Sequence, residues 1–409
     1  MAPRYIPIHL RHAAGPSVEG FALLSGIEAA IRGLMISVMP LVVYDALGDA
    51  RAESQLYFFV GCGSLVTGLM VPWLTRFVPR RWMYTLGTLF YMIGMSLAIS
   101  GGATAIGLAL LMTAFGTVTC FVCLNAYVLD YVPRLDLGRC QSKQMLYAAT
   151  SWTLGPVMGV WLRSLWAPAP FVGGLIGAVV LLTAFWILRL GNGKEISRAK
   201  GPAPNPVAYL GRFLTQPRLV LGWSFAVIRS CGWWVYVVYL PIFCVQSGLG
   251  DDLGGMALSL SNCFLYITPL MLRLVQRATV RRAVRAAFLG CGTLFCLAAL
   301  ASPVPWATVV LTAMASGFLV LLDVSAGLPF LMAVKPSERT EMAAIYSSFR
   351  DVSGILTPGV AWLVLMVAPL PGIFAAAGVA LLSASALAGR LHPRLGVARP
   401  SHGAPVAGE

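Results

Sequence analysis

Charged residues are scarce in this chain. They make up 11% of its 409 positions, and hydrophobic residues make up 58%. A soluble globular protein carries about a quarter charged residues. So few charges cannot cover a soluble protein of this length, and the apolar runs recur from end to end. The composition therefore excludes a soluble domain and indicates that lipid is the solvent for most of the surface.

Histidine is also rare, and its positions exclude several kinds of chemistry. The four histidines are His9, His12, His392 and His402, all near the ends of the chain. Intramembrane enzymes need clustered histidines, Ser–His pairs or metal-binding carboxylates. No such cluster occurs within the apolar runs. We expect neither an enzyme nor a bound metal or other cofactor.

Two further absences concern energy and partners. The phosphate-binding pattern G-x-x-x-x-G-K-[ST] does not occur, so transport driven directly by ATP is not expected. The net charge is +14, but the basic residues form short clusters between apolar runs. Nucleic-acid binding requires a continuous basic face. The charge pattern therefore predicts no nucleic-acid partner.

What the sequence does contain is a series of apolar segments of membrane-spanning length. A helix needs about 20 apolar residues to cross the hydrocarbon core. We predict twelve such spans. Only four residues, Pro369 to Gly372, separate the last two, so eleven spans are the alternative. The predicted spans are 20–44, 54–75, 82–100, 104–130, 142–165, 170–190, 218–246, 253–274, 284–302, 305–334, 342–367 and 370–390.

Basic residues between these spans collect on one side of the predicted membrane. Only Arg51 and Arg163 fall on the opposite side. Cytoplasmic loops carry the excess of Lys and Arg, so both termini are predicted to be cytoplasmic. Arginine outnumbers lysine in this sequence, and both alanine and glycine are abundant. This composition suggests a GC-rich bacterium and hence a cell inner membrane. The opposite side carries the acids Asp45, Asp49, Glu53, Asp251 and Asp252.

A basic, proline-rich stretch and an internal repeat divide the chain. The segment from Pro72 to Arg80 resembles the segment from Pro269 to Arg277, and Ala29–Arg32 matches Ala226–Arg229 at the same offset. Parallel repeats of this kind are a known transporter design. The predicted regions are a tail at 1–19, a six-helix bundle at 20–190, a linker at 191–217, a second six-helix bundle at 218–390 and a tail at 391–409.

Two motifs resemble those of the major facilitator superfamily. The stretch from Pro72 to Arg81 (PWLTRFVPRR) is similar to that family's G-x-L-x-D-x-x-G-R-R loop, with Arg76 in place of the aspartate. Gly155 and Pro156 resemble the end of a motif found in its antiporters. The resemblance implies an all-α fold of two pseudo-symmetric six-helix bundles around a central cavity.

The resemblance also suggests gating groups. The arginines of the loop, Arg76, Arg80 and Arg81, act in gating or only anchor the topology; the missing aspartate leaves both open. Gly155 and Pro156 act in a gate or make an ordinary kink and packing site. Further gating candidates near the cytoplasmic helix ends are Asp130, Lys143, Arg350 and Asp351.

Four ionisable residues fall well inside predicted spans: Glu28, Arg32, Arg229 and Asp323. Such residues are costly in a bilayer and usually face a cavity. Arg32 and Arg229 occupy matching positions of the repeat and together suit a carboxylate or phosphate, similar to the paired arginines of the family's organophosphate:phosphate antiporters. The alternative is that Glu28 neutralises Arg32 and Asp323 neutralises Arg229.

Proton coupling requires a group that titrates within the membrane. No histidine is available there, so Glu28 is the first candidate and Asp323 the second. Asn125, Tyr127, Trp233 and Tyr236 are candidate substrate-binding residues, although Trp and Tyr also anchor helices at the membrane interface.

The sequence therefore predicts a secondary transporter that moves a small organic solute by alternating access. Its partners are the solute, protons and the lipid bilayer, and a monomer is expected. Proton-coupled efflux is the leading prediction. An importer or exchanger of organic anions that uses Arg32 and Arg229 is the alternative, and a transporter-like sensor or scaffold is an alternative of another class.

Overall fold

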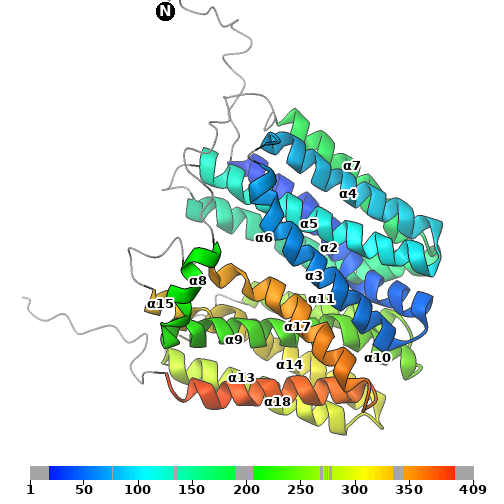
Figure 1. The fold of residues 1–409 in the computed structure, drawn as a ribbon. Coiled ribbons are helices and arrows are strands. Elements are labelled where there is room, and N and C mark those ends of the chain that lie inside the picture. The colour runs from blue at the N-terminus through cyan, green and yellow to red at the C-terminus, as the bar shows by residue number, and fades with distance from the viewer. Residues whose placement is uncertain are drawn as a thin grey trace, which may run out of the picture. The chain divides into compact units, whose positions relative to one another are not determined.

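The chain is helical throughout the part that its computed structural model describes. The described residues are 18–75, 77–132, 137–188, 206–267, 270–271, 273, 275, 279–334, 342 and 345–391. Every regular element within these ranges is a helix (Figure 1). Arg76, most of the tails at 1–19 and 391–409 and residues 191–205 of the linker lie outside them.

The described residues divide into two compact units. The first contains everything up to Ala203 together with Cys244–Asn262, and the second contains Pro204–Phe243 and the residues from Cys263 onward. The helices before Ala203 are α2 (Val18–Leu47), α3 (Ala50–Leu74), α4 (Arg80–Ser100), α5 (Ala103–Tyr131), α6 (Leu137–Leu165) and α7 (Ala169–Ile187).

The second part of the chain is more broken in its secondary structure. One continuous helical stretch changes to a π-helix and back between Pro217 and Gln246. The elements are α8 (Pro206–Leu214), α9 (Pro217–Trp234), η1 (Val235–Tyr239), α10 (Leu240–Gln246), α11 (Asp252–Cys263), η2 (Phe264–Ile267), α13 (Val280–Leu300), α14 (Pro305–Ser325), α15 (Leu328–Ala333), α17 (Phe349–Val364) and α18 (Pro371–Ala388).

Each of the twelve predicted spans contains helix. Nine helical stretches of the described chain are long and apolar enough to cross a bilayer. The last two predicted spans are separate helices, because α17 ends at Val364 and α18 begins at Pro371. Proline is favoured in the first turn of a helix, where its missing N–H is not needed. The sequence 369–372 therefore starts a new helix.

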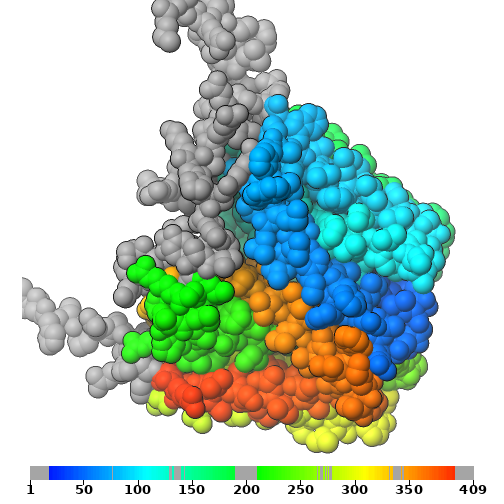
Figure 2. Space-filling model, in the orientation of Figure 1, coloured from blue at the N-terminus to red at the C-terminus, as the bar shows by residue number. Residues whose placement is uncertain are grey.

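Helix α3 shows how the outer surface is suited to lipid. It is the least buried of the nine stretches. Its outer side lies open in the space-filling view (Figure 2). Large exposed apolar surfaces mark contacts with membrane or protein, so this helix is suited to face acyl chains. The large apolar side chains that it exposes are Phe59, Val66, Leu69, Met70 and Trp73.

Glycines let α2 and α6 approach closely at the centre of the first unit. A Cβ atom on Gly155 would lie 2.4 Å from the backbone carbon of Gly33, and one on Gly33 would lie 2.5 Å from the carbonyl oxygen of Ser151. The hydroxyl of Ser37 donates to the carbonyl of Pro156 at 2.8 Å. Small residues allow this kind of backbone contact between membrane helices. The contact places α2, and the charges it carries, directly against α6.

This contact yields a prediction about stability. Gly155→Ala is expected to destabilise the protein by about 1 to 2 kcal/mol, because the added methyl group forces two backbones apart. Gly107→Ala is the matched control, since its Cβ would lie 3.7 Å from the nearest atom, in ordinary contact with Leu56. Thermal unfolding of purified protein measures both variants. Equal melting temperatures for the two would contradict the tight contact.

Candidate functional site

The first charged pair lies on α2. Glu28 is 6% exposed, and its Oε1 atom lies 3.7 Å from Nη1 of Arg32, one helical turn away. The Arg32 side chain keeps 36% of its surface accessible, and its guanidinium carbon lies 5.2 Å from the centre of the Trp152 ring on α6. A guanidinium over an indole face is an attractive arrangement. Arg32 is therefore held by a carboxylate and an aromatic ring but remains accessible.

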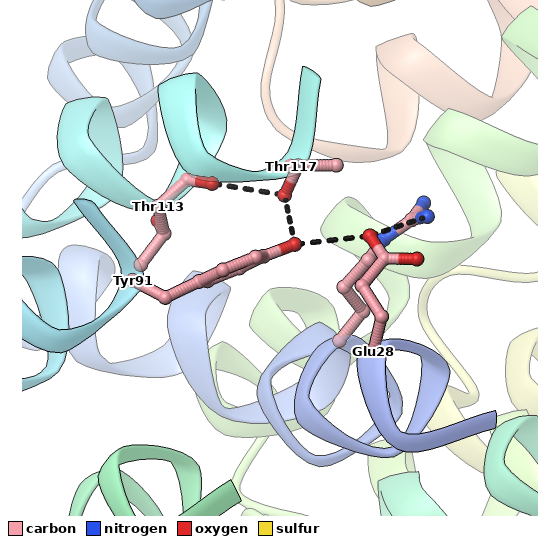
Figure 3. Close-up of polar contacts among 5 residues, drawn as sticks. Glu28, Tyr91, Thr113 and Thr117 are labelled. Atoms are coloured by element: carbon pink, nitrogen blue, oxygen red, sulfur yellow. Dashed lines mark hydrogen bonds and ion pairs between the residues drawn. The ribbon is translucent and has the colours of Figure 1, made fainter. Parts of the chain in front are cut away.

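Glu28 also belongs to a chain of hydroxyl groups. The Tyr91 hydroxyl of α4 donates to Oε1 of Glu28 at 3.1 Å and lies 2.8 Å from Oγ1 of Thr117 on α5. Thr117 in turn donates to the carbonyl of Thr113 at 2.8 Å. Figure 3 shows these groups converging from three helices. Oε1 of Glu28 is thus the atom on which the Arg32 ion pair and the Tyr91 hydrogen bond meet.

The second charged pair joins α9 to α14. Nε of Arg229 lies 3.2 Å from Oδ1 of Asp323. The indole N–H of Trp233, on the same helix as Arg229, donates to Oδ2 of Asp323 at 3.0 Å. The Arg229 guanidinium carbon lies 5.2 Å from the centre of the Phe349 ring on α17. Both oxygens of the Asp323 carboxylate are therefore engaged.

The two arginines are held in similar ways but to different degrees. Each contacts a carboxylate and an aromatic ring, so both ion pairs of the alternative interpretation form. The Arg229 side chain is 12% exposed and its pair is the shorter, whereas Arg32 is 36% exposed with a contact of 3.7 Å. A pair at 3.7 Å is longer than a direct hydrogen bond. Arg32 is consequently the arginine that is better placed to exchange its partner.

A family model described as Major Facilitator Superfamily matches residues 21–358. The chain belongs to the major facilitator superfamily. This superfamily consists of transporters rather than enzymes, so the chain is a multi-pass membrane protein and a secondary transporter. The predicted family and the all-helical membrane fold are confirmed.

Solved structures agree with this membership in the superfamily. A crystal structure of the nucleoside transporter NupG has a TM-score of 0.69 at 14% identity, covering 92% of this chain and 99% of that chain. A crystal structure of a mutant of that transporter has a TM-score of 0.70 at 12% identity, covering 91% and 99%. At such identities the likeness shows a shared fold alone. No curated protein sequence matches the chain.

The remaining residues predicted to bind substrate lie in different surroundings. Asn125 is exposed, whereas Tyr127 and Tyr236 are buried. The Tyr127 ring packs near Phe185, with the guanidinium carbon of Arg80 5.6 Å from the ring centre. The structure therefore brings Trp233 to the charged groups, with the centre of the buried Tyr236 ring 6.1 Å from the centre of the Trp233 ring, and places Tyr127 within the packed interior.

The predicted gating residues of this superfamily member are also dispersed. Lys143 forms an ion pair with Glu19 of α2. Arg350 lies with its guanidinium carbon 5.7 Å from the ring centre of Phe349, and Asp351 is partly exposed. Arg76 and the side chain of Asp130 lie outside the described residues. Arg80 is placed beside Tyr127, Arg81 lies in the first turn of α4, and Gly155 and Pro156 form the contact with α2.

At the other end of α2 and α6, Arg163 contacts two of the five acids predicted on one side of the membrane. Arg163 forms ion pairs with Asp45 and with Asp251, the latter at 3.6 Å. Asp251 lies just before α11, which belongs to the first unit. Within the described residues, no group of three His, Cys, Asp or Glu side chains is placed to hold a metal ion. The contacts of Arg163 tie Asp45, α6 and the start of α11 together.

Proposed function

We propose that the chain transports a small organic solute with an acidic group together with protons. One observation supports this proposal above the others. A single buried oxygen, Oε1 of Glu28, carries the ion pair with the accessible Arg32. Ionisable groups inside membrane proteins are rare and usually take part in transport. Glu28 is the proposed proton-binding residue, and Arg32 is the proposed solute-binding residue.

The mechanism follows from competition for one guanidinium group. While Glu28 is ionised, its carboxylate occupies Arg32. When Glu28 binds a proton, it loses its negative charge and the attraction between the two side chains falls. A carboxylate or phosphate of the solute then takes the place of Glu28, because a guanidinium binds either group through parallel hydrogen bonds. Proton and solute are bound together and cross together by alternating access.

Arg229 is not the proposed solute-binding residue. Asp323 forms an ion pair with Arg229 and accepts a hydrogen bond from Trp233, so the charges of this group already cancel. Asp323 is the second candidate for the proton. The basic residues between the spans support cytoplasmic termini. The excess of arginine over lysine, with abundant alanine and glycine, supports a bacterial cell inner membrane.

Proton-coupled efflux is the second candidate. It is supported by Gly155 and Pro156, which resemble an antiporter motif and form the tight contact of α6 with α2. The two candidates differ in the direction of proton movement. A pH-sensitive dye inside proteoliposomes distinguishes them when solute is added outside. Co-transport lowers the internal pH, whereas exchange raises it.

Identifying the solute tests the role of Arg32. A thermal-shift screen of purified protein should include monocarboxylates, dicarboxylates, phosphate esters, nucleosides and organic amines. We expect acidic compounds to stabilise the protein, and Arg32→Gln to weaken their binding by at least about tenfold, since hydrogen bonds to a charged group contribute about 1.5 to 3 kcal/mol. Glu19→Gln serves as a control on the same helix. Stabilisation by amines or nucleosides alone, unchanged in Arg32→Gln, would contradict the proposal.

A further inference from the structure

The hydroxyl groups of Tyr91 and Thr117 form a chain of hydrogen-bond contacts that begins at Glu28, and the protons available for these contacts can be counted. Three contacts occur in series: Glu28 to Tyr91 at 3.1 Å, Tyr91 to Thr117 at 2.8 Å, and Thr117 to the carbonyl of Thr113 at 2.8 Å. A phenol and an alcohol each carry one O–H proton. Two protons therefore serve three contacts when Glu28 is ionised.

Protonation of Glu28 supplies the missing proton. A protonated Oε1 donates to the oxygen of Tyr91, Tyr91 donates to Thr117, and Thr117 donates to the carbonyl of Thr113. All three contacts in Figure 3 then have a donor and an acceptor. The O–H bonds of Tyr91 and Thr117 rotate and neither bond breaks, so the only added proton is the one on Glu28.

The same change acts on Arg32. Oε1 is the atom of Glu28 that faces both Tyr91 and Nη1 of Arg32. Once Oε1 donates a proton to Tyr91, it is no longer the anionic acceptor of the guanidinium. We propose that Tyr91 and Thr117 are positioning residues that stabilise protonated Glu28 and thereby release Arg32 to the solute. This inference rests on the proposed function of Glu28.

The hydroxyl chain lies among few other titratable groups of the described residues. Those that interact with Glu28 are Arg32 on its own helix, Tyr84 and Tyr91 on α4 and Cys120 on α5. Helix α7 contains no charged residue.

The described charges on the other helices packed against α2 lie towards the helix ends. On α6, Lys143 is paired with Glu19 and Arg163 with Asp45, and Glu53 of α3 lies near Asp45. At about 1.5 Å per residue, Glu19 and Asp45 are about 14 and 26 Å from Glu28 along α2. Arg80 and Arg81 of α4 are similarly about 15 Å along the helix from Tyr91.

The experiment measures proton binding by Glu28 in the whole protein, without any solute. The full-length protein is reconstituted in phosphatidylethanolamine–phosphatidylglycerol bilayers, and infrared difference spectra follow the C=O band of protonated carboxyl groups against pH. The band that disappears in Glu28→Gln belongs to Glu28. Thr117→Val removes the acceptor of the Tyr91 proton at similar volume. We expect it to lower the proton affinity of Glu28 about tenfold, moving the midpoint about one pH unit lower.

Two further variants separate positioning from general disturbance. Thr117→Ser retains the hydroxyl and should retain the wild-type midpoint. In a Tyr91→Phe background, Thr117→Val should cause no further shift, because Thr117 acts only through Tyr91. If Thr117→Val does not fold, Thr117→Ala removes the same hydroxyl and is expected to give the same shift.

The possible outcomes distinguish this inference from the proposed function. A Glu28 band that titrates identically in the wild type and in Thr117→Val, or a shift that persists in the Tyr91→Phe background, overturns the role of Tyr91 and Thr117 alone. If Glu28→Gln removes no titrating band, Glu28 does not bind the proton, and both the proposed function and this inference are wrong.

Discussion

Replacing Glu28 with glutamine is expected to abolish accumulation of solute against its concentration gradient. Glutamine resembles the protonated side chain but cannot release a proton, so the carrier loses its coupling step. One pH unit corresponds to about 1.4 kcal/mol, or a factor of ten. A gradient of two units therefore supports about 100-fold accumulation per coupled proton in the wild type and none in Glu28→Gln. Uptake of radiolabelled solute, identified by the thermal-shift screen, into proteoliposomes measures the ratio.

The matched measurements show whether coupling alone has been lost. Exchange of labelled for unlabelled solute, without a pH gradient, should continue in Glu28→Gln, because exchange does not require the carrier to bind or release a proton. Glu19 lies on the same helix as Glu28 and pairs with Lys143 of α6. The Glu19→Gln variant should accumulate solute normally. If Glu28→Gln accumulated solute as the wild type does, the proton would have to bind elsewhere, with Asp323 as the next residue to test.

Helix positions were predictable because hydrophobicity over about 20 residues is a property of the sequence alone. Each predicted span contains helix, and the separation of α17 from α18 follows from Pro371. Breaks within a span were not predictable. The π-helix at Val235–Tyr239 and the end of α11 at Cys263 lie in runs whose apolar character continues unchanged. Such local changes depend on packing against neighbouring helices, which hydrophobicity does not report.

The charged groups of the site were predictable, but their hydrogen-bond partners were not. Residues four positions apart on a helix are neighbours, so the Glu28–Arg32 pair followed from spacing. The Arg229–Asp323 pair followed from the need to neutralise buried charge. Tyr91 and Thr117 gave no signal, because tyrosine and threonine occur throughout the apolar runs. Their role depends on how α4 and α5 pack with α2, which only the three-dimensional structure supplies.

The difference between the two ion pairs gives a second large prediction. Asp323→Ala is expected to destabilise the protein by about 3 kcal/mol. It leaves the Arg229 side chain, 12% exposed, without its carboxylate. Removing one partner of a buried ion pair costs about 3 to 5 kcal/mol, because the other charge stays buried and unpaired. The low end applies here since Asp323 keeps a third of its side chain accessible. Thermal or denaturant unfolding of purified protein measures the loss.

A neutral double variant separates the cost of an unpaired charge from the loss of a needed interaction. Arg229→Gln combined with Asp323→Asn removes both charges and should recover most of the stability, since a neutral pair leaves no buried charge. Glu28→Gln should cost less than about 1 kcal/mol, because the Arg32 side chain that loses its partner is 36% exposed and its contact with Glu28 is long. An equal loss in Glu28→Gln and Asp323→Ala would show that the two pairs are equivalent. That result would remove the reason for assigning solute binding to Arg32 rather than Arg229.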